Sequence, residues 1–172
     1  FYTGMRVGEL LALSWGDIDF THDNMKISIN KTKQRVNGRW IVTPPKTKKS
    51  ERVIAIHNRL GEMLAYWKKL QYKEKKSDFI FRADKSVIKK CIDRTCKQNN
   101  LNRIRIHDLR HSHVALLIHL EANIIEIANR LGHNNIQTTM NTYAHLYPDK
   151  QKIIADKLAK LTEPIKSDIK VT

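Results

Sequence analysis

The strand-like patterns of this chain all fall within residues 25–56, and this position constrains the fold more than any other feature. Residues 25–29 and 52–56 alternate apolar and polar side chains, and residues 39–43 follow the turn signal Asn37-Gly38. The loop at residues 44–50 begins with two prolines and is rich in lysine. The sequence therefore predicts one small antiparallel sheet of three strands with a lysine-rich tip.

Helical spacing or helix-boundary residues mark most of the remaining chain. Gly16 and Gly132 are expected to end helices, Asn58 to cap one, and Pro148 to open the last. The expected helices are residues 7–15, 58–72, 85–98, 108–120, 124–131, 136–146 and 149–161. The fold class is therefore α+β, mainly helical, with a small three-stranded antiparallel sheet.

The chain of 172 residues fits one domain, expected over residues 1–161. Residues 162–172 contain Pro164 and mixed charges and are expected to form an extended or mobile tail. Because the sequence begins at Phe1 and enters an apolar segment at once, we interpret it as a fragment of a longer protein.

Basic residues outnumber acidic ones by 32 to 17, which gives a formal net charge of +15. Residues 26–52 carry nine Lys or Arg and one acid, and residues 85–110 carry eight against two acids. An excess of this size favours a polyanionic partner, most often nucleic acid, although a solvated basic surface would also explain the charge alone.

Cysteine content and hydropathy exclude several other classes. Cys91 and Cys96 lie five apart on one expected helix, a spacing wrong for a disulfide there and too sparse for zinc. No run is long and apolar enough to span a membrane, and no signal peptide is present. The sequence therefore predicts a cytoplasmic protein in a reducing compartment.

Two short segments place cationic side chains where they could bind an anion. Arg6 stands at a glycine-flanked helix start, where a guanidinium can bridge two phosphate oxygens; alternatively it forms a surface salt bridge with Glu9. His107 and Arg110 share one face of a helix with His111. A lone histidine there would be a cap or a satisfied core residue, but burying this pair without an anion is costly.

Three further residues have simple structural explanations when each is taken alone. His133 follows a helix-ending glycine and would be a cap, and Tyr143 would be a core residue of an amphipathic helix. Lys46 lies in the proline-containing loop and would be solvated.

The order and spacing of these segments resemble the catalytic domain of tyrosine recombinases, and within that family the integrases of phages and integrative elements of Gram-positive bacteria. The matching segments are TGMRVGEL at residues 3–10, PKTK at residues 45–48, HDLRH at residues 107–111, LGH at residues 131–133, and Tyr143 ten residues after His133. The resemblance extends from Thr3 to about Leu146, and every expected position is filled.

The resemblance implies a role for each matching residue. Tyr143 would be the nucleophile, Lys46 the general acid for the leaving 5′ oxygen, and Glu9 the acid that steadies the first arginine. The remaining catalytic positions would be filled by Arg6, His107, Arg110 and His133. The residues expected to contact DNA are Lys31, Lys33, Arg35, Lys48, Lys49 and Arg105.

The implied chemistry is DNA cleavage and rejoining through a 3′-phosphotyrosyl link, without a metal, a cofactor or ATP. Two arginines and histidine donors would stabilise the charge that grows on the phosphate oxygens, and the cationic pocket would help a phenol with a pKa of about 10 to attack. The implied partners are double-stranded DNA, a homo-oligomer that is tetrameric on DNA and weak or monomeric alone, and accessory factors that bend DNA or set direction.

The resemblance also implies further features of the whole protein. DNA-reading domains would precede this segment, the tail after Tyr143 would dock on a neighbouring subunit, and the protein would serve a phage or mobile element at the bacterial nucleoid.

Three other readings remain open from the sequence. A type IB topoisomerase would share the fold and pocket, and a non-enzymatic DNA-binding module would use the basic surface alone. A metal-dependent relaxase would use His111 and His113, although these two imidazoles would diverge on a helix.

Overall fold

The computed structural model describes residues 1–45, 47–147 and 151–162. The helices are α1 (Val7–Ala12), α2 (Asn58–Lys69), α3 (Lys85–Gln98), α4 (Asp108–His119), α5 (Ile124–Leu131), α6 (Ile136–Tyr143) and α7 (Gln151–Thr162). The short 3-10 helices are η1 (Trp15–Asp17), η2 (Lys48–Ser50) and η3 (Ala144–Leu146). The strands are β1 (Ile18–Asp19), β2 (Lys26–Ile29), β3 (Thr32–Val36), β4 (Arg39–Thr43) and β5 (Arg52–Ala55).

The strands form two separate antiparallel sheets, so the predicted membership of the three-stranded sheet was wrong. The three-stranded sheet has the order β1-β2-β5, with Ile27 opposite Ile54. Strand β4 pairs instead with β3 through the turn Asn37-Gly38, whose φ angles of 48° and 80° suit a two-residue hairpin. Strand β3 escaped prediction because its residues do not alternate and none is fully buried.

The β1-β2-β5 sheet supplies one hydrophobic core. Its apolar side chains pack with those of the segment after α1 and with Ile80. Leu60 and Leu64 of α2 pack against this core. The buried members are Leu13, Trp15, Ile18, Met25, Ile27, Ile29, Ile54, Ile56 and Ile80. The alternation seen at residues 25–29 and 52–56 is therefore the inward face of this sheet.

Several helix boundaries differ from the sequence prediction. Helix α6 ends at Tyr143, where η3 follows, rather than near residue 146. Helix α1 ends at Ala12 rather than residue 15, because Leu13 turns extended and its carbonyl accepts from the Ile80 amide, 2.9 Å away. Gly16 therefore lies inside η1 and does not end α1. The cap of α2 is His57 rather than Asn58, and α2 ends at Lys69 rather than near residue 72.

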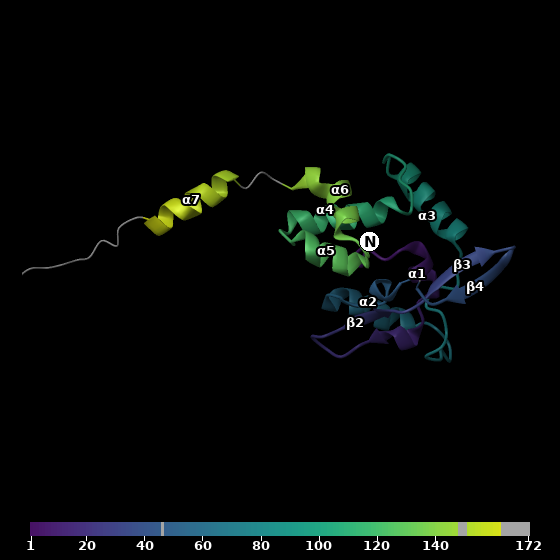
Figure 1. The fold of residues 1–172 in the computed structure, drawn as a ribbon. Coiled ribbons are helices and arrows are strands. Elements are labelled where there is room, and N and C mark those ends of the chain that lie inside the picture. The colour runs from purple at the N-terminus through teal and green to yellow at the C-terminus, as the bar shows by residue number, and fades with distance from the viewer. Residues whose placement is uncertain (46, 148–150, 163–172) are drawn as a thin grey trace, which may run out of the picture.

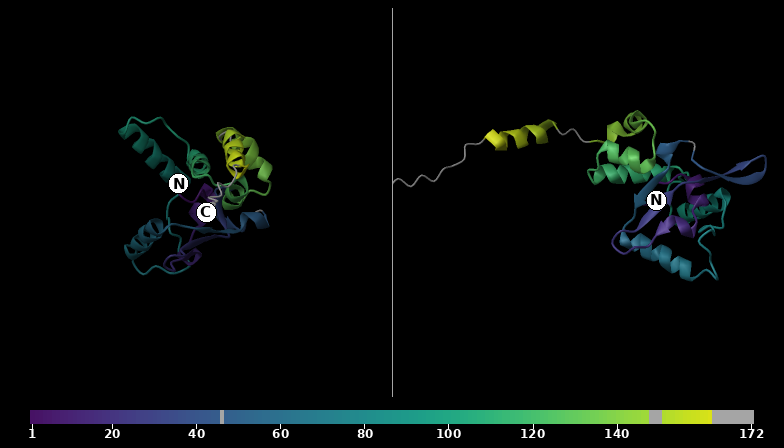
Figure 2. Two further views of the ribbon diagram at one scale, coloured as in Figure 1. Left: turned by 90° about the vertical axis from the view of Figure 1, so that its left-hand side faces the viewer. Right: turned by 60° about the horizontal axis from the view of Figure 1, so that its bottom comes forward.

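Helices α4, α5 and α6 form a second hydrophobic core around Val114, Ile118, Ile127, Leu131 and Tyr143. Figure 1 shows this helical cluster above the sheet, and the end of α5 contacts β5 at the junction. The hairpin β3-β4 and helix α7 both project from the body in the views of Figures 1 and 2.

Within the described segments, no helix has the length and apolar character needed to cross a membrane. Of the expected tail at residues 162–172, Thr162 is the last residue of α7, and residues 163–172 lie outside the described residues, as does Pro148.

Candidate active site

The site is built around the carboxyl end of α5, where three arginines from three different elements converge. The carbonyl oxygens of residues 130, 131 and 132 accept, in order, from Arg52 Nε at 2.7 Å, Arg110 Nη2 at 2.8 Å and Arg6 Nη2 at 3.5 Å. These carbonyls have no partner within the helix, and they form the negative end of its dipole. The turn that exposes them requires a left-handed residue, and Gly132 supplies it with φ of 67°.

The buried carboxylate of Glu9 joins two of these arginines. Its oxygens accept from Arg52 Nη1 and Nη2 at 3.1 and 2.9 Å, and from Arg6 Nη1 and the Arg6 amide at 2.9 and 2.8 Å. Burial pushes the pKa of Glu9 up, but the hydrogen bonds and charges of Arg52 and Arg6 outweigh it and leave the pKa below its usual value. Glu9 is therefore an anion that holds Arg6 in place.

Arg110 is almost fully buried, and the first turn of the chain and α5 hold its guanidinium from two sides. Nη1 donates to the Gly4 carbonyl at 2.6 Å, and Nη2 lies 2.8 Å from the Leu131 carbonyl. Burial, reinforced by the charge of Arg6, lowers the pKa of Arg110 to about 10, so it remains a cation at neutral pH. A buried cation next to a second one, Arg6, is a strong site for an anion.

His133 is a neutral imidazole that orients Arg110. Burial, with the charge of Arg110 next, lowers the pKa of His133 to about 4. Its Nε2 lies 3.0 Å from Arg110 Nη2, which can only donate, so Nε2 accepts. The ring proton must then be on Nδ1, which donates to the buried hydroxyl of Thr139, 2.7 Å away on α6.

Tyr143 is the last residue of α6, and its ring packs in the second hydrophobic core, as a structural tyrosine would. Its hydroxyl, however, has a polar partner. The hydroxyl oxygen lies 2.5 Å from Nδ1 of His111 on α4. Burial raises the pKa of Tyr143, and the positive charge of Arg110 acts in the opposite direction. The candidate nucleophile therefore lies within the field of the arginine cluster.

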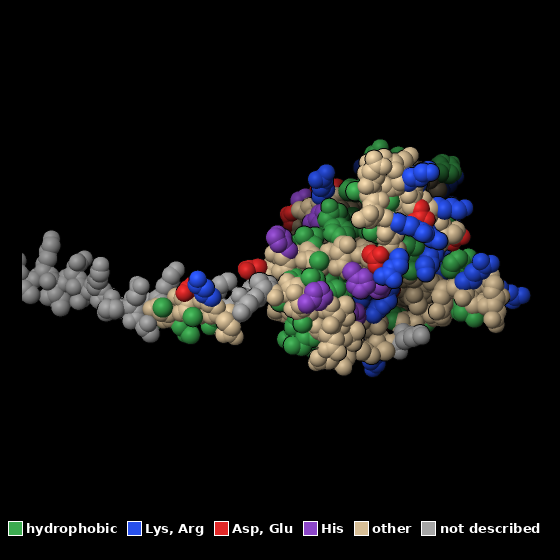
Figure 3. Space-filling view, turned by 90° about the horizontal axis from the view of Figure 1, so that it is seen from above, with side chains coloured by type: hydrophobic (Ala, Val, Ile, Leu, Met, Phe, Trp, Pro, Cys, Tyr) green, Lys and Arg blue, Asp and Glu red, His purple; other side chains and the backbone are tan. Residues whose placement is uncertain are grey.

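His107 lies one turn before His111 and stacks edge-on against it, with ring centroids 4.8 Å apart. Burial, followed by the charges of His111 and Arg110, lowers the pKa of His107. His107 and His111 line a hollow together with basic residues of α3 and of the segment before α4, namely Lys85, Lys89, Arg103 and Arg105. Figure 3 shows histidine and basic side chains gathered on one face of the body.

Most of the residues expected to contact DNA already have partners within the chain. Lys31 forms an ion pair with Asp17 at 2.6 Å, and Arg105 forms one with Asp108 at 2.9 Å. Arg35 Nε donates to the Gly38 carbonyl at 3.1 Å. A DNA contact by any of them stays a prediction, and for Lys31 it competes with a short ion pair.

The other predicted basic residues occupy the hairpin and the loop before β5. The Lys33 ammonium lies over the rings of Phe79 and Trp40, at 4.5 and 5.5 Å from their centroids. Lys48 and Lys49 are in η2, and Lys49 Nζ donates to the Asn134 carbonyl at 3.2 Å, next to His133. Lys46 lies outside the described residues.

Sequence reasoning missed three residues of the site. Arg52 gave no local signal, because it was one of nine basic residues in its segment. Thr139 has an ordinary place in an amphipathic helix, and only the folded chain brings it to His133. His111 did give a signal, since it follows His107 by four residues on the same helix face.

The structure separates the two histidines of the relaxase reading. His111 faces Tyr143, whereas His113 is buried and accepts from Arg130 Nε at 3.2 Å. Across residues 1–45, 47–147 and 151–162, no three His, Cys, Asp or Glu side chains are grouped to hold a metal ion.

Comparisons with known proteins agree with this geometry. The model of the phage integrase family matches residues 1–150. The ICEBs1 integrase of Bacillus subtilis strain 168 is 41% identical over 94% of this chain, and the integrase of Staphylococcus phage L54a is 33% identical over 92%. These matches cover 47% and 49% of the two relatives, so the chain spans about half of their length.

Solved structures show the same fold. The Tn1549 transposon integrase in complex with circular intermediate DNA matches 92% of this chain and 56% of its own, with a TM-score of 0.74 at 21% identity. The catalytic domain of bacteriophage HP1 integrase matches 95% of this chain and 80% of its own, with a TM-score of 0.58 at 22% identity. The family match over residues 1–150, together with the 41% identity to the ICEBs1 integrase, shows that the chain belongs to the phage integrase family of tyrosine recombinases.

Proposed function

We propose that this chain is the DNA-cleaving and rejoining domain of a site-specific recombinase that integrates or excises a phage or another mobile element. The observation that carries the proposal is the cluster of Arg6, Arg110 and His133, in which the charge of Arg110 acts on the phenol of Tyr143. The relatives named integrases, and the Tn1549 integrase bound to circular intermediate DNA, support a DNA substrate.

The proposed reaction follows from the charges in the site. A phosphodiester between Arg6 and Arg110 gains two cationic donors as negative charge grows on its non-bridging oxygens. The Tyr143 oxygen attacks phosphorus, the 5′ oxygen leaves, and the product is a 3′-phosphotyrosyl link that a different 5′-hydroxyl can later attack. Because this exchange conserves a phosphodiester bond, it requires no ATP. The two arginines supply the charge stabilisation that a metal ion provides in other phosphoryl-transfer enzymes.

We assign the proton for the leaving 5′ oxygen to Lys46, following the resemblance. The described part of the same loop supports this proposal, because Lys49 is held at the Asn134 carbonyl beside His133. Hydrogen bonding between the Thr47 and Ser50 hydroxyls, at 2.9 Å, closes the loop just after residue 46. A lysine carried by a loop that reaches Asn134, next to His133, is a suitable general acid for the leaving oxygen.

The cleavage activity can be tested with a nicked suicide substrate, which traps the covalent complex because the strand beyond the cut diffuses away. We expect a covalent protein–DNA species on a denaturing gel, with equal yield in buffer containing EDTA and without ATP. A yield that collapses in EDTA and returns with Mg²⁺ would contradict the metal-free reaction. A substrate pair with one and two target sites then distinguishes recombination from the relaxation expected of a topoisomerase.

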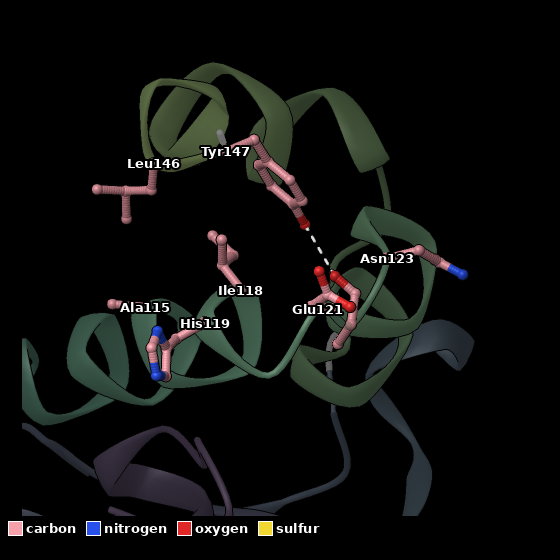
Figure 4. A pocket seen from close by; sticks show the side chains of 8 residues that line it. Ala115, Ile118, His119, Glu121, Asn123, Leu146 and Tyr147 are labelled. Atoms are coloured by element: carbon pink, nitrogen blue, oxygen red, sulfur yellow. Dashed lines mark hydrogen bonds between the residues drawn. The ribbon is translucent and has the colours of Figure 1, made fainter. Parts of the chain in front are cut away.

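We also propose that the protein assembles on DNA as a homo-oligomer, with α7 of one copy seated on another. A pocket between α4, the following loop and η3 is lined by Ala115, Ile118, His119, Glu121, Ala122, Asn123, Leu146 and Tyr147 (Figure 4). Helix α7 lies away from the body in Figures 1 and 2, and its Ile154, Leu158 and Leu161 recur at helical spacing with exposures of 50%, 57% and 81%. An apolar helix face and an open apolar-lined pocket on the same chain suit exchange between copies.

The assembly proposal predicts a selective defect. Replacing Ile154→Glu together with Leu161→Glu should abolish the higher oligomer on DNA but leave the cleavage of a half-site intact, as measured by sedimentation and by the suicide substrate. The matched control is Lys152→Gln with Lys157→Gln, which changes the net charge equally on polar positions of α7 and should assemble normally. Equal assembly by both double variants would show that α7 does not hold the copies together.

A further inference from the structure

The hydroxyl of the proposed nucleophile already contacts a possible proton acceptor. Tyr143 Oη lies 2.5 Å from Nδ1 of His111, a distance at the short end of the range for a hydrogen bond to oxygen. The two residues come from α6 and α4, which pack against each other in the second hydrophobic core. The contact is therefore fixed by tertiary packing and does not depend on bound DNA.

Two other candidate bases near the site, His133 and Glu9, are already hydrogen-bonded elsewhere. Both ring nitrogens of His133 have partners, Thr139 Oγ1 and Arg110 Nη2. The Glu9 carboxylate accepts four hydrogen bonds from Arg6 and Arg52. His107 stacks edge-on against His111, and among the described residues the hydrogen bond to the Tyr143 hydroxyl comes from His111.

We propose that His111 is a catalytic residue: the general base that removes the proton of Tyr143 during strand cleavage. This assignment rests on the proposed function and deepens it. As Oη forms its bond to phosphorus and the bond from phosphorus to the 5′ oxygen breaks, the Oη proton moves to Nδ1 of His111. The leaving 5′ oxygen takes its own proton from the general acid assigned to Lys46.

The same contact serves the rejoining step in reverse. When a 5′-hydroxyl attacks the phosphotyrosyl bond, the Tyr143 oxygen leaves and takes the proton back from the His111 imidazolium. His111 also lines the basic hollow, which is open to water for proton exchange. His111 therefore acts as base in cleavage and as acid in rejoining, as microscopic reversibility requires.

The environment of Tyr143 explains why a base is needed. Its ring belongs to the second core, and burial raises the pKa of the phenol. Arg110 favours the phenolate but does not contact the oxygen through any hydrogen bond recorded for the described residues. The His111 ring nitrogen at hydrogen-bond distance can supply the acceptor that the arginine cannot.

The test compares His111→Ala and His111→Asn by single-turnover cleavage of the suicide substrate. Asparagine can place an acceptor near the position of Nδ1, but it cannot take up a proton at neutral pH. We expect both variants to lose about 100-fold or more in cleavage rate, the range typical of a lost general base. Wild-type cleavage by His111→Asn would overturn the proposal, because it would show that the contact only positions Tyr143.

Chemical rescue tests proton transfer itself. Removing the side chain in His111→Ala opens space next to the basic hollow, which free imidazole can enter from solvent. We expect imidazole to raise the rate of His111→Ala by about tenfold or more, and more basic substituted imidazoles to raise it further, as general-base catalysis requires. Rescue that is absent, or that does not depend on basicity, would overturn the proposal.

Controls separate the proposed role of His111 from a folding defect and from failure of the proposed cleavage function. His145→Ala removes an exposed histidine two residues after Tyr143 and should cleave at the wild-type rate without any response to imidazole. DNA affinity and the thermal midpoint of the two His111 variants show whether they are folded. If the wild-type protein itself forms no covalent complex, the proposed function fails; if it does and His111→Asn equals it, only the role of His111 fails.

Discussion

Replacing Tyr143 with phenylalanine should abolish the covalent protein–DNA complex while leaving the fold and DNA affinity nearly unchanged. The ring packs with Val114, Ile118, Ile127 and Leu131, and phenylalanine preserves these contacts. The change removes only the nucleophilic oxygen and its hydrogen bond to His111, whose loss costs about 0.5–1.5 kcal/mol of folding free energy. The suicide-substrate gel measures the first effect, and a DNA titration and thermal melt measure the others.

The matched control for this prediction is Tyr2→Phe, which removes the hydroxyl of a tyrosine that is 52% exposed. It should form the covalent complex at the wild-type rate. A complex that survives Tyr143→Phe would instead place the nucleophile at Tyr2 or at Tyr147, whose hydroxyl donates to the Ala122 carbonyl at 3.3 Å.

The second large effect is expected at the two arginines of the phosphate site. Arg6→Ala and Arg110→Ala should each lower the single-turnover cleavage rate by about two orders of magnitude or more, because each removes a cationic donor from the developing charge. DNA binding should weaken far less, since many other Lys and Arg remain on the basic surface. Equal losses in binding and cleavage would show that both arginines only grip phosphate.

Arg6→Ala and Arg110→Ala are expected to differ in their effects on the stability of the fold. The Arg6 side chain is 41% exposed, so Arg6→Ala should leave the thermal midpoint close to that of the wild type. Arg110→Ala leaves the Gly4 and Leu131 carbonyls and His133 Nε2 without their donor, and each unsatisfied buried group costs about 1–3 kcal/mol. Arg6 therefore provides the cleaner catalytic test, and Arg6→Lys shows whether the charge alone suffices without the forked donor.

Elements whose boundaries are encoded locally could be predicted from the sequence. Helices α3 and α5 have the expected bounds because their ends depend on neighbouring residues: Asp84 and Asn123 cap them, and Gly132 closes α5. The proposed catalytic residues could also be predicted, because their order and spacing resemble those of a known family. The convergence of Arg6, Arg110 and His133 agrees with that assignment.

Features that depend on partners distant in the chain could not be predicted in this way. The sequence does not reveal that β4 pairs with β3 rather than joining the main sheet, because both strands of the hairpin are largely exposed. Likewise, Arg52 is recognisable as part of the site only when folding brings it to Glu9, and Lys31 as a structural cation only beside Asp17.

The central claim is that Tyr143 forms a covalent bond with the 3′-phosphate of the cut strand, and peptide mapping of the trapped complex tests it most directly. Trypsin cleaves after Arg130 and Lys150, so residues 131–150 form one peptide that contains Tyr143 and Tyr147. After nuclease trimming, fragmentation in the mass spectrometer should place a nucleotide on Tyr143, linked through its 3′-phosphate. A nucleotide on Tyr147 or any other residue, or a link through a 5′-phosphate, would contradict the account.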